Sequence, residues 1–376
     1  MTTRSRVRRR VGAMCLLLAV AAGPAVAHEG VRALVEREMA DGVVGGLSVG
    51  VVEGDRLVYS EGFGLADIER RVPARADHVY RIGSITKQLT AYALLALQKD
   101  GALRLTDPVA SHVPEFGEID GRGHALDRIT LYQLATMTSG LAREPDDLET
   151  HLVGPASEWT DVALRALAEV SVEHPPGTRY QYSNIGYAIL GLAVERASGH
   201  DYMDFVRESF LAPLGMDDTD FVPRSRFEER IAIGYVVGDD GSVDDERPAW
   251  EHLGRGYKVP NGALYSTVAD LARFISFQLG HGPDSVLPRR LLEENFATKG
   301  SSTGDLSSGY GVGFRVTRSG ELIATGHTGS VAGYRAAALF DRASGKGVVV
   351  LRNVTGGELD VVELAMAILE RVASED

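Results

Sequence analysis

The strand-like runs of this sequence lie near its two ends, and the middle of the chain is mainly helical. Two apolar runs, 47–52 and 56–62, flank Glu53-Gly54-Asp55, which predicts a hairpin. Four more strands are expected at 310–316, 322–327, 333–341 and 347–353, and terminal helices at 29–40 and 358–372. Strands so far apart in the chain bury their apolar faces most simply in one shared layer. We therefore predict one antiparallel sheet built from both chain ends and flanked by the terminal helices.

Helical segments alternate with loops rich in proline and glycine between the two groups of strands. Helices are expected at 84–99, 131–136, 159–168, 185–198, 202–210 and 267–279. The fold class is therefore α/β, more narrowly α+β. A sheet lobe would comprise residues 28–83 and 267–376, and a helical lobe residues 84–266, together forming one catalytic domain. The seam between such lobes is a common place for a cleft.

The first 27 residues have the pattern of an export signal. Five arginines between positions 4 and 10 precede an uncharged apolar run, 11–22, and Ala25-Val26-Ala27 offers a small-x-small cleavage site. The apolar run is short for a membrane span, and no later stretch approaches the required length. We predict cleavage between Ala27 and His28, a periplasmic or extracellular location, and no transmembrane anchor after cleavage.

Charge and cysteine content exclude several classes of function. The formal net charge is −13, and basic residues cluster only at the extreme N-terminus, so binding to nucleic acid is not expected. The single cysteine, Cys15, lies inside the predicted signal, which leaves no thiol for disulfides, catalysis or zinc. The histidines are scattered and form no H-E-x-x-H pattern. We expect neither a metal nor another cofactor.

Ser84 and Lys87 form the first pattern that can carry chemistry. If Ser84 opens a helix, the two residues are three apart on one face, and the helix dipole favours negative charge beside the serine. A lysine that is partly buried there loses some preference for its proton and can act as a general base. The alternative is a helix-capping serine beside a solvated lysine.

Two further elements offer polar groups to a substrate. Tyr182 precedes Ser183-Asn184 at a predicted helix start, where its phenol can relay a proton and the Asn184 amide can hold a carbonyl; alternatively, these residues only cap the helix. Gly326-His327-Thr328-Gly329-Ser330 follows a strand and is expected to include a hairpin turn. The backbone N–H groups of Ser84 and Ser330 are candidates for an oxyanion hole.

These elements, in this order, resemble the Ser-x-x-Lys, Tyr-x-Asn and His/Lys-Thr-Gly signatures of the penicillin-recognising serine hydrolases. The surrounding residues resemble the branch that includes class C β-lactamases, soluble D-alanyl-D-alanine carboxypeptidases, D-aminopeptidases and family VIII esterases. The resemblance runs from about residue 47 to residue 353 and implies a β-lactamase/transpeptidase-like fold. It implies that Ser84 is the nucleophile, that Lys87 and Tyr182 transfer protons, and that Asn184 contacts the substrate.

One position departs from the β-lactamase pattern. Class C β-lactamases usually carry lysine where this sequence has His327, and a neutral histidine does not attract a carboxylate in the same way. The resemblance places His327 and Thr328 on the wall opposite Lys87, where the hydroxyls of Thr328 and Ser330 can bind a carboxylate. The expected activity is therefore that of a D-Ala-D-Ala carboxypeptidase-like enzyme or an esterase, with weak or no β-lactamase activity.

Two other classes of protein are alternatives to this assignment. The chain has no G-x-S-x-G nucleophile elbow, which disfavours a Ser-His-Asp hydrolase. A non-catalytic scaffold that binds peptidoglycan or assembles with itself on the same fold is the alternative from another class. The expected partner is a small-molecule or peptide substrate, and peptidoglycan is one source of such a substrate.

Overall fold

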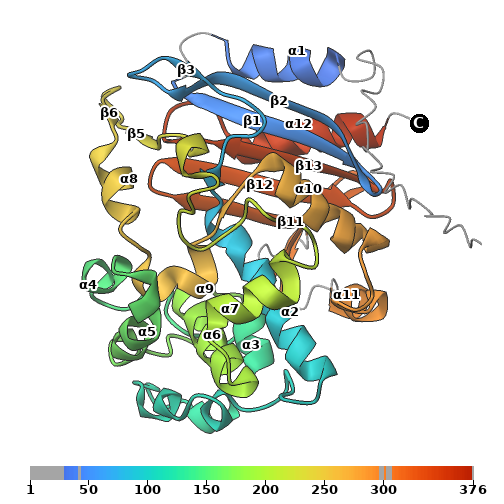
Figure 1. Ribbon diagram of the computed structural model, residues 1–376. Coiled ribbons are helices and arrows are strands. Elements are labelled where there is room, and N and C mark those ends of the chain that lie inside the picture. Colours follow the sequence, from blue (N-terminus) through green and yellow to red (C-terminus); the bar gives the residue numbers. More distant parts are fainter. Residues whose placement is uncertain (1–28, 41–43, 296–299, 302–306, 375–376) are drawn as a thin grey trace, which may run out of the picture.

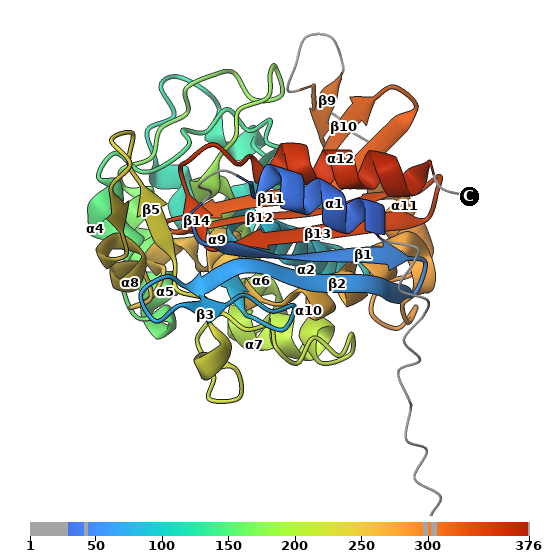
Figure 2. The same cartoon turned by 90° about the horizontal axis from the view of Figure 1, so that it is seen from above.

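The computed structural model describes residues 29–40, 44–295, 300–301 and 307–374. The predicted export signal, with its cleavage site, lies outside these residues. A large sheet divides the molecule: two terminal helices cover one face, and the helical part of the chain lies against the other (Figures 1 and 2). Among the described residues, no helix combines the length and apolar character that a membrane crossing requires.

The helices are distributed over the whole chain. They are α1 (Glu29–Glu38), α2 (Thr86–Lys99), α3 (Leu131–Ala135), α4 (Leu148–Leu152), α5 (Trp159–Leu167), α6 (Asn184–Ser198), α7 (Tyr202–Val206), α8 (Glu246–Glu251), α9 (Val259–Gly262), α10 (Val268–Ser276), α11 (Arg289–Asn295) and α12 (Val361–Ala373).

The longer strands lie near the two ends of the chain, as expected. The strands are β1 (Gly46–Glu53), β2 (Arg56–Asp67), β3 (Val72–Pro73), β4 (Tyr80–Arg81), β5 (Tyr235–Val237), β6 (Val243–Asp244), β7 (Tyr265–Ser266), β8 (Gly300–Ser301), β9 (Ser308–Tyr310), β10 (Arg315–Ser319), β11 (Leu322–Val331), β12 (Tyr334–Asp341), β13 (Lys346–Arg352) and β14 (Val354–Thr355).

Strands from both ends pair in one sheet, which confirms the central prediction. Its order is β3-β2-β1-β13-β12-β11-β10-β9-β8. The N-terminal hairpin joins the C-terminal strands through the antiparallel pair β1–β13, in register from Leu47 opposite Arg352 to Glu53 opposite Lys346. Helices α1 and α12 pack together on the outer face, where Val31, Val35 and apolar residues of α12 are buried. The shorter strands and helices, such as β5, β14 and α9, were not predicted because so few residues show no periodicity.

Two predictions for the C-terminal strands were wrong. The run 310–316 is not one strand, because the extended conformation is interrupted between the end of β9 at Tyr310 and the start of β10 at Arg315. Gly313, in this interruption, has φ +84°, and an added Cβ would lie 2.5 Å from the Ala91 Cβ. The segment 326–330 is not a hairpin turn. Strand β11 continues through it to Val331, and the connection to β12 comes at Ala332 and Gly333 instead. The His-Thr-Gly segment is therefore extended backbone.

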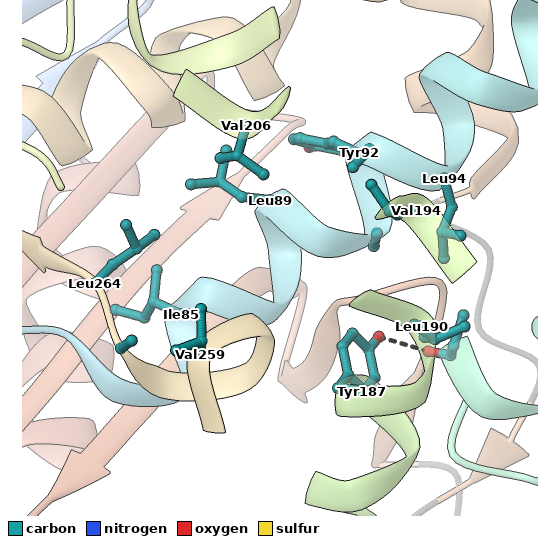
Figure 3. Close-up of a cluster of buried hydrophobic side chains, with 14 of the residues drawn as sticks. Ile85, Leu89, Tyr92, Leu94, Tyr187, Leu190, Val194, Val206, Val259 and Leu264 are labelled. Atoms are coloured by element: carbon teal, nitrogen blue, oxygen red, sulfur yellow. Dashed lines mark hydrogen bonds between the residues drawn. The ribbon is translucent and has the colours of Figure 1, made fainter. Parts of the chain in front are cut away.

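Helix α2 is the central element of the helical part. Most of its side chains are buried, including Leu89 and Tyr92 (Figure 3). Around it pack side chains from several later segments, labelled in Figure 3: Tyr187, Leu190 and Val194 of α6, Val206 of α7, Val259 of α9 and Leu264. Packing on several sides holds the first turn of α2 in a defined place against the sheet.

Candidate active site

Ser84 lies where the chain passes from the short strand β4, which pairs with β7, into α2. Strand β4 ends at Arg81, and residues Gly83–Ile85 form one 3-10 turn before α2 begins. Gly83 has φ +51°, which favours glycine, and the Thr86 hydroxyl donates a 2.7 Å hydrogen bond to the Gly83 carbonyl. The serine was expected to open the helix itself, whereas it lies in this tight turn just before it.

The side chain of Lys87 points back to Ser84 from the first turn of α2. Its Nζ lies 3.1 Å from Ser84 Oγ, 2.8 Å from Asn184 Oδ1 and 2.9 Å from the carbonyl oxygen of Asn261. The two asparagine oxygens only accept hydrogen bonds. A neutral amine donates one hydrogen to each of them, and its lone pair then remains for the Ser84 hydroxyl proton.

Burial sets the protonation of Lys87. The residue has no exposed surface, which disfavours its charged form and holds its pKa well below the ordinary value. The positive charge of Lys258 acts in the same direction, and the Glu144 carboxylate opposes it. The alternative of a solvated surface lysine is therefore wrong for this residue.

Tyr182 approaches the same serine from the loop before α6. Its ring centroid lies 5.0 Å from Lys87 Nζ and 4.9 Å from Arg143 Cζ. Burial raises its pKa to about 12, against the effects of a hydrogen bond with Ser84 and of Arg315. A neutral phenol of this kind can both accept and donate a proton. The neighbouring Ser183 does cap α6, accepting a 3.0 Å hydrogen bond from the Gly186 N–H.

Asn184 lies at the edge of the cleft, and both ends of its amide are hydrogen-bonded to protein groups. Its Nδ2 donates a 2.6 Å hydrogen bond to Glu144 Oε1, which fixes the amide orientation because a carboxylate only accepts. Its Oδ1 faces Lys87. The expected contact between the Asn184 amide and a substrate carbonyl stays a prediction; in this structure the amide links Lys87 to Glu144.

Strand β11 forms the opposite wall. The ladder with β10 reaches only Gly326, so His327 to Val331 extend past it toward Ser84. The approach is close: a Cβ on Gly329 would lie 1.9 Å from the Ile82 carbonyl oxygen and 3.3 Å from the Ser84 nitrogen. A Cβ on Gly83 would lie 2.9 Å from the Ser330 nitrogen. The backbone nitrogens of Ser84 and Ser330 are thus brought to one place, where both glycines are needed.

His327 is buried in this wall. Burial and the nearby charge of Arg315 hold its pKa well below the ordinary value, so the ring is neutral at pH 7. Its Nδ1 lies 2.6 Å from the Thr328 carbonyl, which can only accept, and Nδ1 therefore carries the hydrogen. The other nitrogen, Nε2, then accepts a 2.9 Å hydrogen bond from the Tyr310 hydroxyl.

A cleft of about 450 Å³ joins these groups. It is lined by Ser84, Tyr182, Asn184, His327, Thr328 and Ser330, all predicted from the sequence, while Lys87 lies beneath Ser84. The lining also includes charged residues to which the sequence signatures assign no role, among them Glu144, Lys258, Arg315 and Arg335. Within the part of the chain that the structure describes, no three His, Cys, Asp or Glu side chains gather as a metal site.

Comparison with known proteins agrees with this geometry. The family model described as Beta-lactamase matches residues 31–373. Protein flp of Staphylococcus aureus strain MRSA252 is 28% identical over 326 residues, which cover 85% of this chain and 62% of that protein. The chain thus spans 62% of the length of this curated relative.

Two solved structures share the fold over nearly the whole chain. The octameric penicillin-binding protein homologue from Pyrococcus abyssi is 26% identical, with a TM-score of 0.78, over 92% of this chain and 77% of that one. The D-stereospecific amidohydrolase from a Streptomyces species is 25% identical, with a TM-score of 0.73, over 91% and 98%. The predicted fold class, including its β-lactamase/transpeptidase-like type, is confirmed.

Proposed function

This chain belongs to the β-lactamase family, and from that membership and the geometry of the cleft we propose that it is a serine hydrolase that forms an acyl-enzyme on Ser84. The observation that carries the proposal is the position of Lys87. Its amine lies 3.1 Å from Ser84 Oγ, while two obligate acceptors take its own hydrogens. The only direction left for the lone pair is the serine hydroxyl.

In the first half of the reaction, Ser84 Oγ attacks the substrate carbonyl carbon while its proton moves to Lys87 Nζ. The backbone N–H groups of Ser84 and Ser330 stabilise the oxyanion, and one such donor is typically worth about 10²–10³ in rate. The carbon–leaving group bond then breaks. The leaving group takes up the proton through Tyr182, and an ester on Ser84 remains. In the second half, the same groups deprotonate water, which attacks this ester and releases Ser84.

The bond cleaved is proposed to be a D-amino-acid peptide or amide bond, or an ester. The likeness to a D-stereospecific amidohydrolase supports the amide. The hydroxyls of Thr328 and Ser330 and the guanidinium of Arg315 line the cleft and suit a carboxylate near the scissile bond. The neutral His327 supplies no charge to hold a β-lactam carboxylate, which supports weak or no β-lactamase activity. The proposed substrates are peptidoglycan fragments, which the protein would reach outside the cytoplasm after its export.

Labelling with a fluorophosphonate and with a fluorescent penicillin tests the proposal. We expect covalent label on the wild-type protein, none on Ser84→Ala, and full label on Ser242→Ala, which changes an exposed loop serine. D-Ala-D-Ala peptides, D-amino-acid amides, p-nitrophenyl esters and nitrocefin then identify the bond. A folded wild-type protein that neither probe labels would instead support the non-catalytic scaffold.

A further inference from the structure

A largely buried ion pair lies behind Asn184 on the helical wall of the cleft. Lys258 Nζ is 3.1 Å from Glu144 Oε1, and the Tyr257 hydroxyl donates a hydrogen bond to Glu144 Oε2. Only 11% of the Lys258 side chain and 20% of the Glu144 side chain are exposed. Isolated charges are costly to bury, and this pair has one partner of each sign.

The ion pair is connected to Lys87 along two short routes. Asn184 accepts from Lys87 through Oδ1 and donates to Glu144 through Nδ2, at 2.8 and 2.6 Å. The second route runs through the backbone: Lys258 immediately precedes α9, and Asn261 of α9 accepts a 2.9 Å hydrogen bond from Lys87. Asn261 also donates a 3.1 Å bond to the Asn184 carbonyl, which closes the connection.

We propose that Lys258, held by Glu144, is a positioning residue that keeps Lys87 in its neutral, proton-accepting form, while Glu144 orients Asn184 against the same amine. The inference rests on the proposed serine hydrolase function. It assigns a role to two residues that belong to none of the three sequence signatures. The ammonium of Lys258 would supply, from the helical wall, a fixed positive charge that the opposite wall lacks at His327.

The charges around Lys87 decide the sign of the effect. Burial lowers the Lys87 pKa most, and Lys258 is the largest charged contributor in the same direction, followed by the more exposed Arg143 and Arg315. The Glu144 carboxylate acts in the opposite direction and raises it. The remaining titratable neighbours are neutral: the rings of Tyr182 and Tyr187 lie 5.0 and 5.6 Å from Nζ, and His327 is held uncharged.

Lys258 itself keeps its charge because of Glu144. Burial lowers the Lys258 pKa, and the carboxylate opposes this. Burial would raise the Glu144 pKa, but Lys258 and hydrogen bonds from Tyr257 and Asn184 outweigh it and lower the pKa. Because Lys258 and Glu144 carry opposite charges, an electrostatic effect on Lys87 can be distinguished from a purely structural role. Their removal should move the protonation of Lys87 in opposite directions.

The test measures the rate of fluorophosphonate modification of Ser84 between about pH 5 and 10. The acidic limb of this pH–rate profile reports protonation of the base. Lys258→Met removes a positive charge, so the Lys87 pKa rises and we expect the limb to move up by about one pH unit. Glu144→Gln removes the negative charge and should move it down. Lys258→Arg keeps the charge and should leave the limb near its wild-type position.

Two further variants complete the design. Lys258→Met combined with Glu144→Gln leaves no unpaired buried charge, so it protects the test against misfolding, and its limb should return toward wild type. Lys99→Met makes the same charge change at the distant end of α2 and should not move the limb. Loss of rate with an unmoved limb in both single charge variants, Lys258→Met and Glu144→Gln, would overturn the proposal. Absence of any wild-type modification would instead overturn the serine hydrolase function on which it rests.

Discussion

The two walls of the cleft differ in how they present polar groups. The helical wall is dense in titratable side chains: Lys87, Tyr182, Glu144 and Lys258 lie within one hydrogen-bonded and electrostatic network. The wall formed by β11 offers backbone N–H groups, two hydroxyls and a histidine held neutral. Protons can move along the first wall, whereas the second can only orient and polarise a substrate. Ser84 lies at the junction, in a turn that touches both.

This division also explains why the two walls are built from different elements. A network of titratable groups needs side chains that converge from several directions, which α2 and the segments before α4, α6 and α9 supply. An oxyanion site needs backbone donors at defined positions, and a strand edge that continues past its neighbour offers them. The following variants test each wall separately, and each can contradict the division.

Loss of the base should have the largest effect. Lys87→Met fills a similar volume without an amine, and acylation of Ser84 should fall by about 10³-fold because the proposed acceptor of the serine proton is gone. Stopped-flow or probe-labelling kinetics measure this. Acylation at more than a tenth of the wild-type rate would show that the base is another residue.

The stability of the same variant checks that the loss is chemical. The pKa of Lys87 is lower in the folded protein than in the unfolded chain. Between these two pKa values the lysine is protonated in the unfolded chain and neutral in the folded protein. The free energy of unfolding that this residue contributes therefore falls as the pH decreases toward the folded-state pKa. Lys87→Met removes that cost. Its Tm at pH 7 should therefore equal or exceed that of the wild type, and the difference should shrink as the pH rises toward the ordinary lysine pKa.

Displacement of the strand wall should have the next largest effect. In Gly329→Ala the new methyl group would meet the Ile82 carbonyl at 1.9 Å, so β11 must move away from the turn that holds Ser84. We expect kcat to fall by about 10²-fold through the oxyanion donors. Gly117→Ala, where nothing lies within 4 Å of an added Cβ, is the matched control. Equal activity of the two variants would mean that Ser330 N–H is not a donor.

A change of charge on the strand wall should have the smallest effect. His327→Lys places an amine where the neutral ring accepts from Tyr310, and that hydroxyl can accept instead. The kcat/KM for a carboxylate-bearing peptide should rise about tenfold relative to a neutral ester. An unchanged ratio in parallel assays would show that the carboxylate lies elsewhere in the cleft.

Much of the site could be predicted because its signatures are local. Ser84 and Lys87 are three residues apart, so any helical path of the chain brings their side chains to one face. The His-Thr-Gly segment was identified, but its conformation was not: glycine at 326, 329 and 333 indicates a turn, and only the pairing with β12 shows that residues 326–331 are extended. Glu144 and Lys258 lie more than a hundred residues apart in unremarkable loops, and no spacing rule joins them.

By itself, the sequence determined that strands from both ends share one sheet and that Lys87 lies beside Ser84. These follow from hydrophobic periodicity and from contacts within one turn of helix. Tertiary structure alone decided that Lys87 is fully buried, that Asn184 contacts Glu144 and Lys87, and that His327 is neutral. Protonation depends on burial and on charges brought close by folding, and neither quantity is a property of neighbouring residues in the chain.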